Sequence, residues 1–116
     1  MYNCAMSNNP LLKGTLQTII LKLLADNTEM YGYEITQKVK EVTDGEIMIT
    51  EGALYPALHK LEAEGLLDVE VEKVDNRMRK YYKLTEKGTS ETVNRLAELE
   101  EFIKNMQNIV NPKLSY

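Results

Sequence analysis

The sequence feature that most constrains the fold is a pair of strand-like runs that directly follows an amphipathic segment. Residues 66–74 alternate apolar and acidic side chains, residues 78–84 form a second strand-like run, and the polar residues 75–77 lie between them. Two such runs joined by a short polar tip are typical of a β-hairpin. Since residues 51–65 have helical spacing and end at a glycine, the sequence predicts a helix followed at once by a hairpin.

Helical spacing of apolar residues predicts three further helices around this unit. Apolar residues recur every three or four positions over residues 10–26, 31–43 and 85–110, which places them on one helix face in each segment. A short stretch, residues 46–49, contains two β-favouring isoleucines. The predicted order is helix, helix, short strand, helix, strand, strand and long helix. This is a mainly α fold with a small β-hairpin wing (α+β).

The first six predicted elements have the order of a winged helix-turn-helix. In that design the third helix enters the major groove of DNA, and the hairpin wing lies over the adjacent backbone or minor groove. We therefore divide the chain into a flexible N-terminus (1–9), a winged-helix DNA-binding domain (10–85), a C-terminal dimerisation helix (86–110) and a tail (111–116). A chain of 116 residues suits one compact domain with one appended element.

The predicted third helix has one apolar face and one small, mildly polar face. Its leucines share the side that should pack inward, and Tyr55, His59 and Lys60 lie on or beside the opposite, nearly acid-free side. Small residues let a helix approach base edges, and these three polar groups can hydrogen-bond to phosphates or bases. An ordinary surface helix is the alternative, and Tyr55 could equally be an aromatic residue at the edge of the core.

Basic charge is concentrated in the predicted hairpin. Residues 73–83 hold five basic side chains against the single acid Asp75, although the whole chain has a net charge of −4. A local basic patch matters more for nucleic-acid binding than the net charge does, and a solvated charged hairpin is the alternative. The predicted DNA-binding residues are Thr50, Tyr55, Pro56, His59, Lys60, Lys73, Arg77, Arg79 and Lys80.

The last predicted helix carries an apolar seam. Apolar residues recur at spacings of 3, 4, 3 and 4 over residues 96–110, which is the a/d pattern of a coiled coil. Two acid–base pairs, Glu91–Arg95 and Glu100–Lys104, should stabilise the helix surface slightly. We predict self-association through the first and last helices, and packing of the last helix on its own domain is the alternative. The predicted dimerisation residues are Leu12, Leu16, Leu96, Leu99, Phe102, Ile103, Met106 and Val110.

The sequence argues against an enzyme, a metal site and a membrane protein. One cysteine, Cys4, and one histidine, His59, provide neither a disulfide nor a familiar set of metal ligands. No combination of nucleophile, base and orienting group is recognisable, and no glycine-rich loop is present to hold phosphates. No apolar run approaches the length of a membrane span, and the first residues lack the pattern of a signal peptide. We expect a cytoplasmic protein without cofactors.

Three segments together resemble the PadR family of transcriptional regulators. Residues 52–67 (GALYPALHKLEAEGLL) closely resemble the recognition helix and following strand of that family. Residues 79–88 (RKYYKLTEKG) resemble its second wing strand and the start of its last helix. Residues 31–35 (YGYEI) resemble its second-helix signature. The resemblance covers roughly residues 10–110, and the first of the three segments is specific.

The resemblance implies a homodimeric winged-helix repressor that binds a pseudo-palindromic operator in double-stranded DNA. It also implies release by a small, often lipophilic effector, and the single C-terminal helix is similar to the shorter branch of the family. The chain contains no tryptophan, so it lacks the residues with which some members stack planar drugs. The alternative function is a winged helix kept as a protein-interaction or ligand-binding module, which the acidic remainder of the chain would favour.

Overall fold

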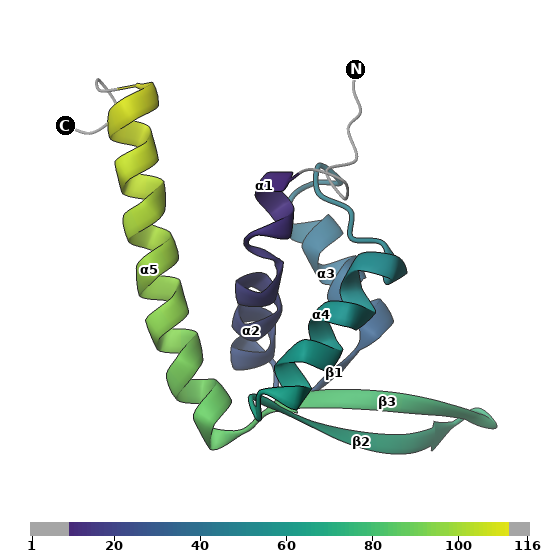
Figure 1. Ribbon diagram of the computed structural model, residues 1–116. Helices are drawn as coiled ribbons and strands as arrows, with labels where there is room; N and C mark the ends of the chain where they lie inside the picture. Colours follow the sequence, from purple (N-terminus) through teal and green to yellow (C-terminus); the bar gives the residue numbers. More distant parts are fainter. Residues whose placement is uncertain (1–9, 112–116) are drawn as a thin grey trace.

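The computed structural model describes residues 10–111, which form a mainly helical chain with a small β-sheet (Figure 1). The elements in chain order are α1 (Pro10–Lys13), α2 (Leu16–Asp26), β1 (Met30–Tyr31), α3 (Gly32–Val42), α4 (Glu51–Ala63), β2 (Leu67–Val74), β3 (Arg77–Leu84) and α5 (Glu86–Val110). The sheet is antiparallel with the strand order β1-β3-β2. The β2–β3 wing projects from beneath α4, and the end of α5 stands apart from the other helices (Figure 1). The predicted fold class is confirmed.

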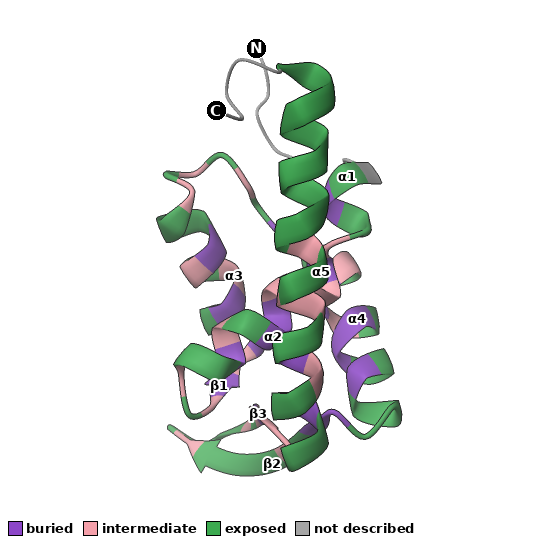
Figure 2. Ribbon diagram, turned by 90° about the vertical axis from the view of Figure 1, so that its left-hand side faces the viewer, coloured by how far each residue is buried: buried purple, intermediate pink, exposed green. Residues whose placement is uncertain are grey.

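The core lies between α2, α3, α4 and the part of the sheet nearest to them. Buried residues gather on the facing sides of these helices, whereas α5 is exposed along most of its length (Figure 2). Each core helix is amphipathic, so burial of its apolar stripe against the other elements stabilises the domain. The largest fully buried side chains are Tyr82, Ile20, Leu21, Ile35, Leu54, Leu58 and Leu61.

Two threonines and a glycine set the limits of α4 and the start of α5. The Thr50 hydroxyl accepts a hydrogen bond from the Ala53 N–H at 3.2 Å and so caps α4. After α4, Gly65 has a φ of +80°, a conformation in which glycine is favoured. The Thr85 hydroxyl accepts from the Gly88 N–H at 2.9 Å and donates to the Gly65 carbonyl at 2.7 Å. The start of α5 is therefore fixed beside the end of α4.

Two sequence predictions about the local structure are wrong. Residues 10–26 form two helices and not one, because the chain turns at residues 14–15 between α1 and α2. Residues 46–49 contain no strand; Ile49 is buried in the core, and the Ile47 N–H donates to the Thr43 hydroxyl at 3.0 Å. The strand that joins the hairpin in the sheet is instead β1, which pairs with the edge of β3 that faces away from β2.

The wing ends in a two-residue turn. Asp75 and Asn76 have φ values of 51° and 64°, and Val74 lies opposite Arg77 in the strand register. Two consecutive residues with positive φ are typical of the primed type I turn, whose twist matches that of a hairpin. Arg77, which the sequence placed in the tip, is the first residue of β3.

Candidate nucleic-acid interface

The two faces predicted for α4 are confirmed by the burial of its side chains. Leu54, Leu58 and Leu61 are completely buried, and Ala57 is also buried beside them. On the opposite side of the helix, Gly52, Pro56, His59, Lys60 and Ala63 are all exposed. This outward face has small and polar side chains that leave the helix backbone accessible. It has the shape and chemistry that a helix needs in order to enter the major groove.

Tyr55 lies at the boundary between α4 and α3. Its ring is half-buried and packs against the hydrophobic core. A side chain at Gly32, the first residue of α3, would overlap the Tyr55 hydroxyl. The absence of a side chain at Gly32 therefore lets the Tyr55 ring lie against the backbone of α3. Tyr55 therefore lies at the edge of the core, which was the alternative left open by the sequence, and it helps to fix the angle between α3 and α4; its contact with DNA stays a prediction.

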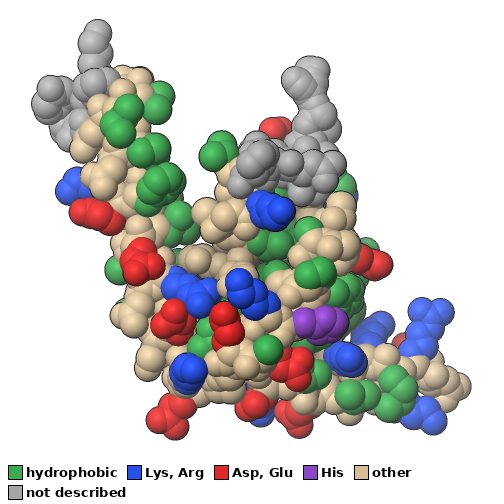
Figure 3. All heavy atoms as spheres, viewed as in Figure 1, with side chains coloured by type: hydrophobic (Ala, Val, Ile, Leu, Met, Phe, Trp, Pro, Cys, Tyr) green, Lys and Arg blue, Asp and Glu red, His purple; other side chains and the backbone are tan. Residues whose placement is uncertain are grey.

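A hollow of about 370 Å³ separates α4 from the wing. Tyr55 and His59 line it from α4, and Arg79 and Lys80 line it from β3. The structure therefore brings together four of the predicted DNA-binding residues. The histidine, the basic side chains of the wing and the outward face of α4 are visible from the same side of the molecule (Figure 3). A phosphate backbone that followed this side would meet α4 and the wing together.

The four basic residues predicted to bind DNA from the wing point to its two opposite faces. Alternate residues of a strand point to opposite sides, and directly paired residues share a side. In the register, Lys80 is two residues from the buried Tyr82, and Lys73 lies opposite Met78 on the same side. Arg77 and Arg79 therefore point to the other face of the wing. Arg79 and Lys80 are neighbours in one strand, so their separation follows from the strand's alternation, whereas the position of Lys73 beside Lys80 depends on the register.

None of these four basic residues forms a salt bridge with any residue between 10 and 111. Lys83, by contrast, pairs with Glu70 at 3.3 Å. Lys73, Arg77 and Lys80 are exposed, whereas Arg79 is half-buried over the ring of Tyr31. Cations without an acidic partner keep their charge available for a phosphate, and such contacts dominate the affinity of proteins for DNA.

A larger hollow, of about 680 Å³, lies on the other side of α4. Thr50, Pro56 and Lys60 line it, and Lys13 and Gln17 face them from α1 and α2. The predicted DNA-binding residues of α4 are thus divided between two hollows. Sequence reasoning missed Lys13 and Gln17, because it treated residues 10–26 as one helix whose apolar face was its important feature.

The predicted dimerisation residues fall into three groups by exposure. Leu12 and Leu16 are buried within the chain, and Leu16 belongs to the main core, so each has little surface left for a second copy. Leu96 and Leu99 are half-buried on α5. Phe102, Ile103, Met106 and Val110 are exposed. Of the two predicted acid–base pairs, Glu91–Arg95 forms at 2.9 Å, whereas Glu100 and Lys104 form no salt bridge within the described part of the chain.

The described residues contain no group of three or more histidine, cysteine, aspartate or glutamate side chains arranged to hold a metal ion. No helix in residues 10–111 has the length and apolar character needed to cross a membrane. Residues 1–9 and 112–116, which the sequence assigned to a flexible N-terminus and a tail, lie outside the described residues, as does Cys4.

Comparison with known sequences identifies related regulators. The profile of the transcriptional regulator PadR-like family matches residues 20–94. A transcriptional regulator of Mycobacterium tuberculosis is 39% identical over 85 residues, which cover 73% of this chain and 76% of that protein. An uncharacterized protein of Lysinibacillus sphaericus is 34% identical over 102 residues, which cover 84% of this chain and 93% of that protein.

Solved structures with the same fold include further regulators. A transcriptional regulator from Clostridium thermocellum has a TM-score of 0.80 and 31% identity, over 87% of this chain and 98% of that chain. The Bacillus subtilis PadR protein in complex with operator DNA has a TM-score of 0.64 and 31% identity. The match to PadR covers 71% of this chain and 46% of that chain.

Proposed function

Because this chain belongs to the PadR-like family of transcriptional regulators, we propose that it is a repressor that binds double-stranded operator DNA as a homodimer. The observation that carries the proposal is the combination of a nearly acid-free outward face on α4 with basic side chains on the adjacent wing that have no salt bridge to any described residue. α4 would read base edges in the major groove, and the wing would bind the phosphates beside it. The related Bacillus subtilis protein with 31% identity was solved on operator DNA, which supports this assignment.

The wing should provide most of the affinity for DNA, and α4 should mainly determine how the protein is oriented on the duplex. The outward face of α4 has only Lys60 and His59 as basic residues, whereas Lys73, Arg77, Arg79 and Lys80 lie on the wing. Each phosphate contact by a basic side chain releases counterions, so the wing should dominate the dependence of DNA binding on salt.

The homodimer is proposed to form through the second half of α5. Phe102, Ile103, Met106 and Val110 are exposed there, so no other part of the described chain buries them. Two copies related by a two-fold axis would present two α4 helices to half-sites roughly 34 Å apart, which requires a pseudo-palindromic operator. A small lipophilic effector bound between the copies would alter the separation of the two α4 helices and release the DNA.

The experiment is a titration of a labelled duplex from the protein's own upstream region, followed by fluorescence anisotropy at several salt concentrations. The variant Arg77→Ala/Arg79→Ala should bind every duplex more weakly. The slope of log K against log[salt] should become shallower by about one unit for each lost phosphate contact. An unchanged slope would remove the two arginines from the mechanism.

The matched control is Lys22→Ala/Lys40→Ala, which removes the same net charge from exposed positions on α2 and α3. This control should change the salt slope by much less than the wing variant does. Excess random duplex should compete poorly with the upstream duplex. Equal weak binding to both duplexes would instead support the protein-interaction or ligand-binding module.

A further inference from the structure

Tyr31 lies where the sheet, α3 and the wing meet. It is the last residue of β1 and lies opposite Tyr81 of β3, with the two ring centroids 5.5 Å apart in an edge-on arrangement. Its N–H donates a hydrogen bond to the Glu34 carboxylate at 3.0 Å, which fixes it to the first turn of α3. The backbone of Tyr31 is therefore held from two sides, and its ring has a defined direction.

The guanidinium group of Arg79 lies over this ring. Its central carbon is 4.3 Å from the centroid of Tyr31, a geometry in which the face of an aromatic ring attracts a cation. A hydrogen bond with the Tyr81 side chain raises the pKa of Arg79, so two tyrosines act on one guanidinium. Arg79 is half-buried as a result, whereas the other three basic residues of the predicted wing contact, Lys73, Arg77 and Lys80, are exposed.

The position of Tyr31 is also fixed relative to the reading helix. Its neighbour Gly32 lies against the Tyr55 hydroxyl, and no larger residue would fit there without a shift. A continuous series of contacts therefore leads from Tyr55 on α4, through the start of α3, to the ring of Tyr31 and the guanidinium of Arg79. These contacts set the direction of the Arg79 side chain relative to α4.

We propose that Tyr31 is a positioning residue for DNA binding, which holds the Arg79 guanidinium in the orientation that meets a phosphate. The inference rests on the proposed function. A long basic side chain loses rotamer freedom when it binds, so a side chain that is already oriented loses less. A guanidinium also stacks on a ring through its flat face, in a way that a lysine ammonium does not. The guanidinium lies over the ring of Tyr31, so a phenylalanine at this position should serve equally well.

A double-mutant cycle tests the proposal with the same upstream duplex. Tyr31→Leu should weaken binding about fivefold, since an exposed cation–ring contact contributes about 1 kcal/mol, and Tyr31→Phe should bind as the unmodified protein does. In the Arg79→Ala background, Tyr31→Leu should have less than about a twofold effect. The salt slope of Tyr31→Leu should stay unchanged, because no charge is lost. An equal loss in both backgrounds would overturn the proposal, as would a loss in Tyr31→Phe as large as in Tyr31→Leu.

Two further variants guard against a simple folding defect. Tyr33→Leu removes an exposed ring that stacks on Tyr31 at 6.5 Å but does not lie over Arg79, and it should bind normally. Arg79→Lys keeps the positive charge but replaces the flat guanidinium, which stacks on the ring, with an ammonium. It should weaken binding about as much as Tyr31→Leu does. Normal binding by Arg79→Lys would contradict the proposal.

The orientation of Arg79 can also be measured without DNA. In the NMR spectrum, the Arg79 side-chain protons should be shifted by the Tyr31 ring and should move toward ordinary values in Tyr31→Leu. Absence of a shift in the unmodified protein would overturn the inference. Failure of the unmodified protein to bind any duplex would instead overturn the proposed function.

Discussion

The two halves of α5 belong to one continuous helix but have different surroundings. In the first half, residues 86–95, Gly88 and Thr92 are buried against the chain's own domain. In the second half every residue from 100 to 110 is exposed, including large apolar ones. Phe102 is 54% exposed, Ile109 71% and Val110 80%. The helix therefore begins on its own domain and ends in a region where residues 10–111 leave its side chains exposed.

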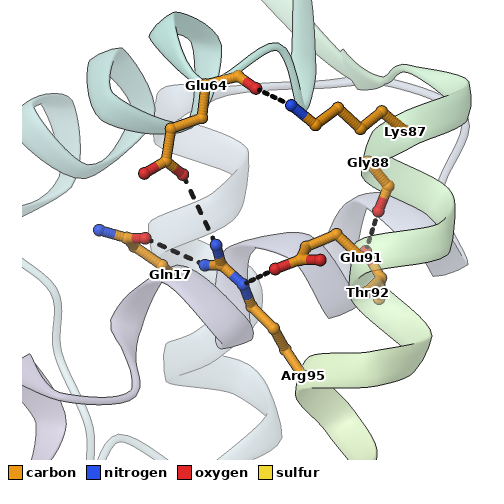
Figure 4. A network of polar contacts seen from close by, with 7 residues as sticks. All are labelled: Gln17, Glu64, Lys87, Gly88, Glu91, Thr92 and Arg95. Atoms are coloured by element: carbon orange, nitrogen blue, oxygen red, sulfur yellow. Dashed lines mark hydrogen bonds and ion pairs between the residues drawn. The ribbon is translucent and has the colours of Figure 1, made fainter.

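Polar contacts hold the first half in place, and Figure 4 shows how they converge. Arg95 donates to the Glu91 carboxylate at 2.9 Å and to the Gln17 side-chain oxygen at 3.1 Å, and it lies 3.5 Å from the Glu64 carboxylate. These three partners lie on α5 itself, on α2 and just after α4. One guanidinium thereby links three helices.

The apolar spacing of 3 and 4 runs from residue 96 to residue 110 and crosses from one environment to the other. Leu96 and Leu99 at its start are half-buried, whereas the apolar residues from 102 onward are exposed. Contiguous exposed apolar side chains on a small protein usually mark an interface. On the proposed function, the second half of α5 is the surface that a second copy covers.

The largest expected effect comes from a charge in the second half. Ile103→Asp should raise the dissociation constant of the dimer at least about a hundredfold, because it would bury a carboxylate without a partner at the interface. Sedimentation or light scattering should then find a monomer, and operator affinity should fall because the two half-sites are no longer bound together.

The matched control is Asn108→Asp, which adds the same charge to another exposed position in the same part of the helix. Asn108 lies about 140° around the helix from Ile103 and about 120° from Phe102, so its variant should remain a dimer. A dimer in the Ile103→Asp sample would show that the second half of α5 is not the interface.

A substitution in the first half should destabilise the fold instead. In Gly88→Ala the new methyl group would overlap the backbone carbonyl of Leu66, which cannot move as a flexible side chain can. We expect a loss of about 1–3 kcal/mol in the free energy of unfolding, measured with urea at one protein concentration.

Gly52→Ala on α4 is the control for the general effect of replacing a helical glycine. A side chain at Gly52 would meet only the Thr50 hydroxyl at 4.0 Å, so this variant should be neutral or slightly more stable. Equal stability of the Gly88→Ala and Gly52→Ala proteins would mean that α5 is not fixed against Leu66.

Sequence reasoning located the helices and the wing well, because these depend on local periodicity. The faces of α4 and the caps at Thr50 and Thr85 also follow from residues close together in the chain. The strand β1 was missed, since Met30 and Tyr31 pair with residues about fifty positions later in the sequence. A two-residue strand carries no periodicity that could be detected.

The candidate interface was predicted as a set of residues but not as an arrangement. The basic charge of the wing was evident, and the alternation of β3 separates Lys80 from Arg77 and Arg79, but only the register places Lys73 on the same face as Lys80. The contact of Arg79 with Tyr31 depends on the β1–β3 pairing, so it was missed together with that strand. The favourable spacing of Glu100 and Lys104 along the helix was not sufficient to form a salt bridge between them. Arg95, by contrast, pairs with Glu91 and also has partners outside α5.

The smallest expected effect concerns the polar contacts that link Arg95 to Glu91, Gln17 and Glu64. Arg95→Met should lower the free energy of unfolding by about 1 kcal/mol, because the side chain is partly exposed and solvent weakens its ion pairs. Lys104→Met, in the second half of α5 and without a salt bridge in the described residues, should change it by less than about 0.5 kcal/mol. The difference should shrink in high salt, which screens the ion pairs of Arg95. Equal losses in the two variants would mean that the polar contacts of Arg95 do not help to hold α5 to its domain, and the contrast between its halves would then rest on the Thr85 hydrogen bond to Gly65, on Gly88 and on Thr92.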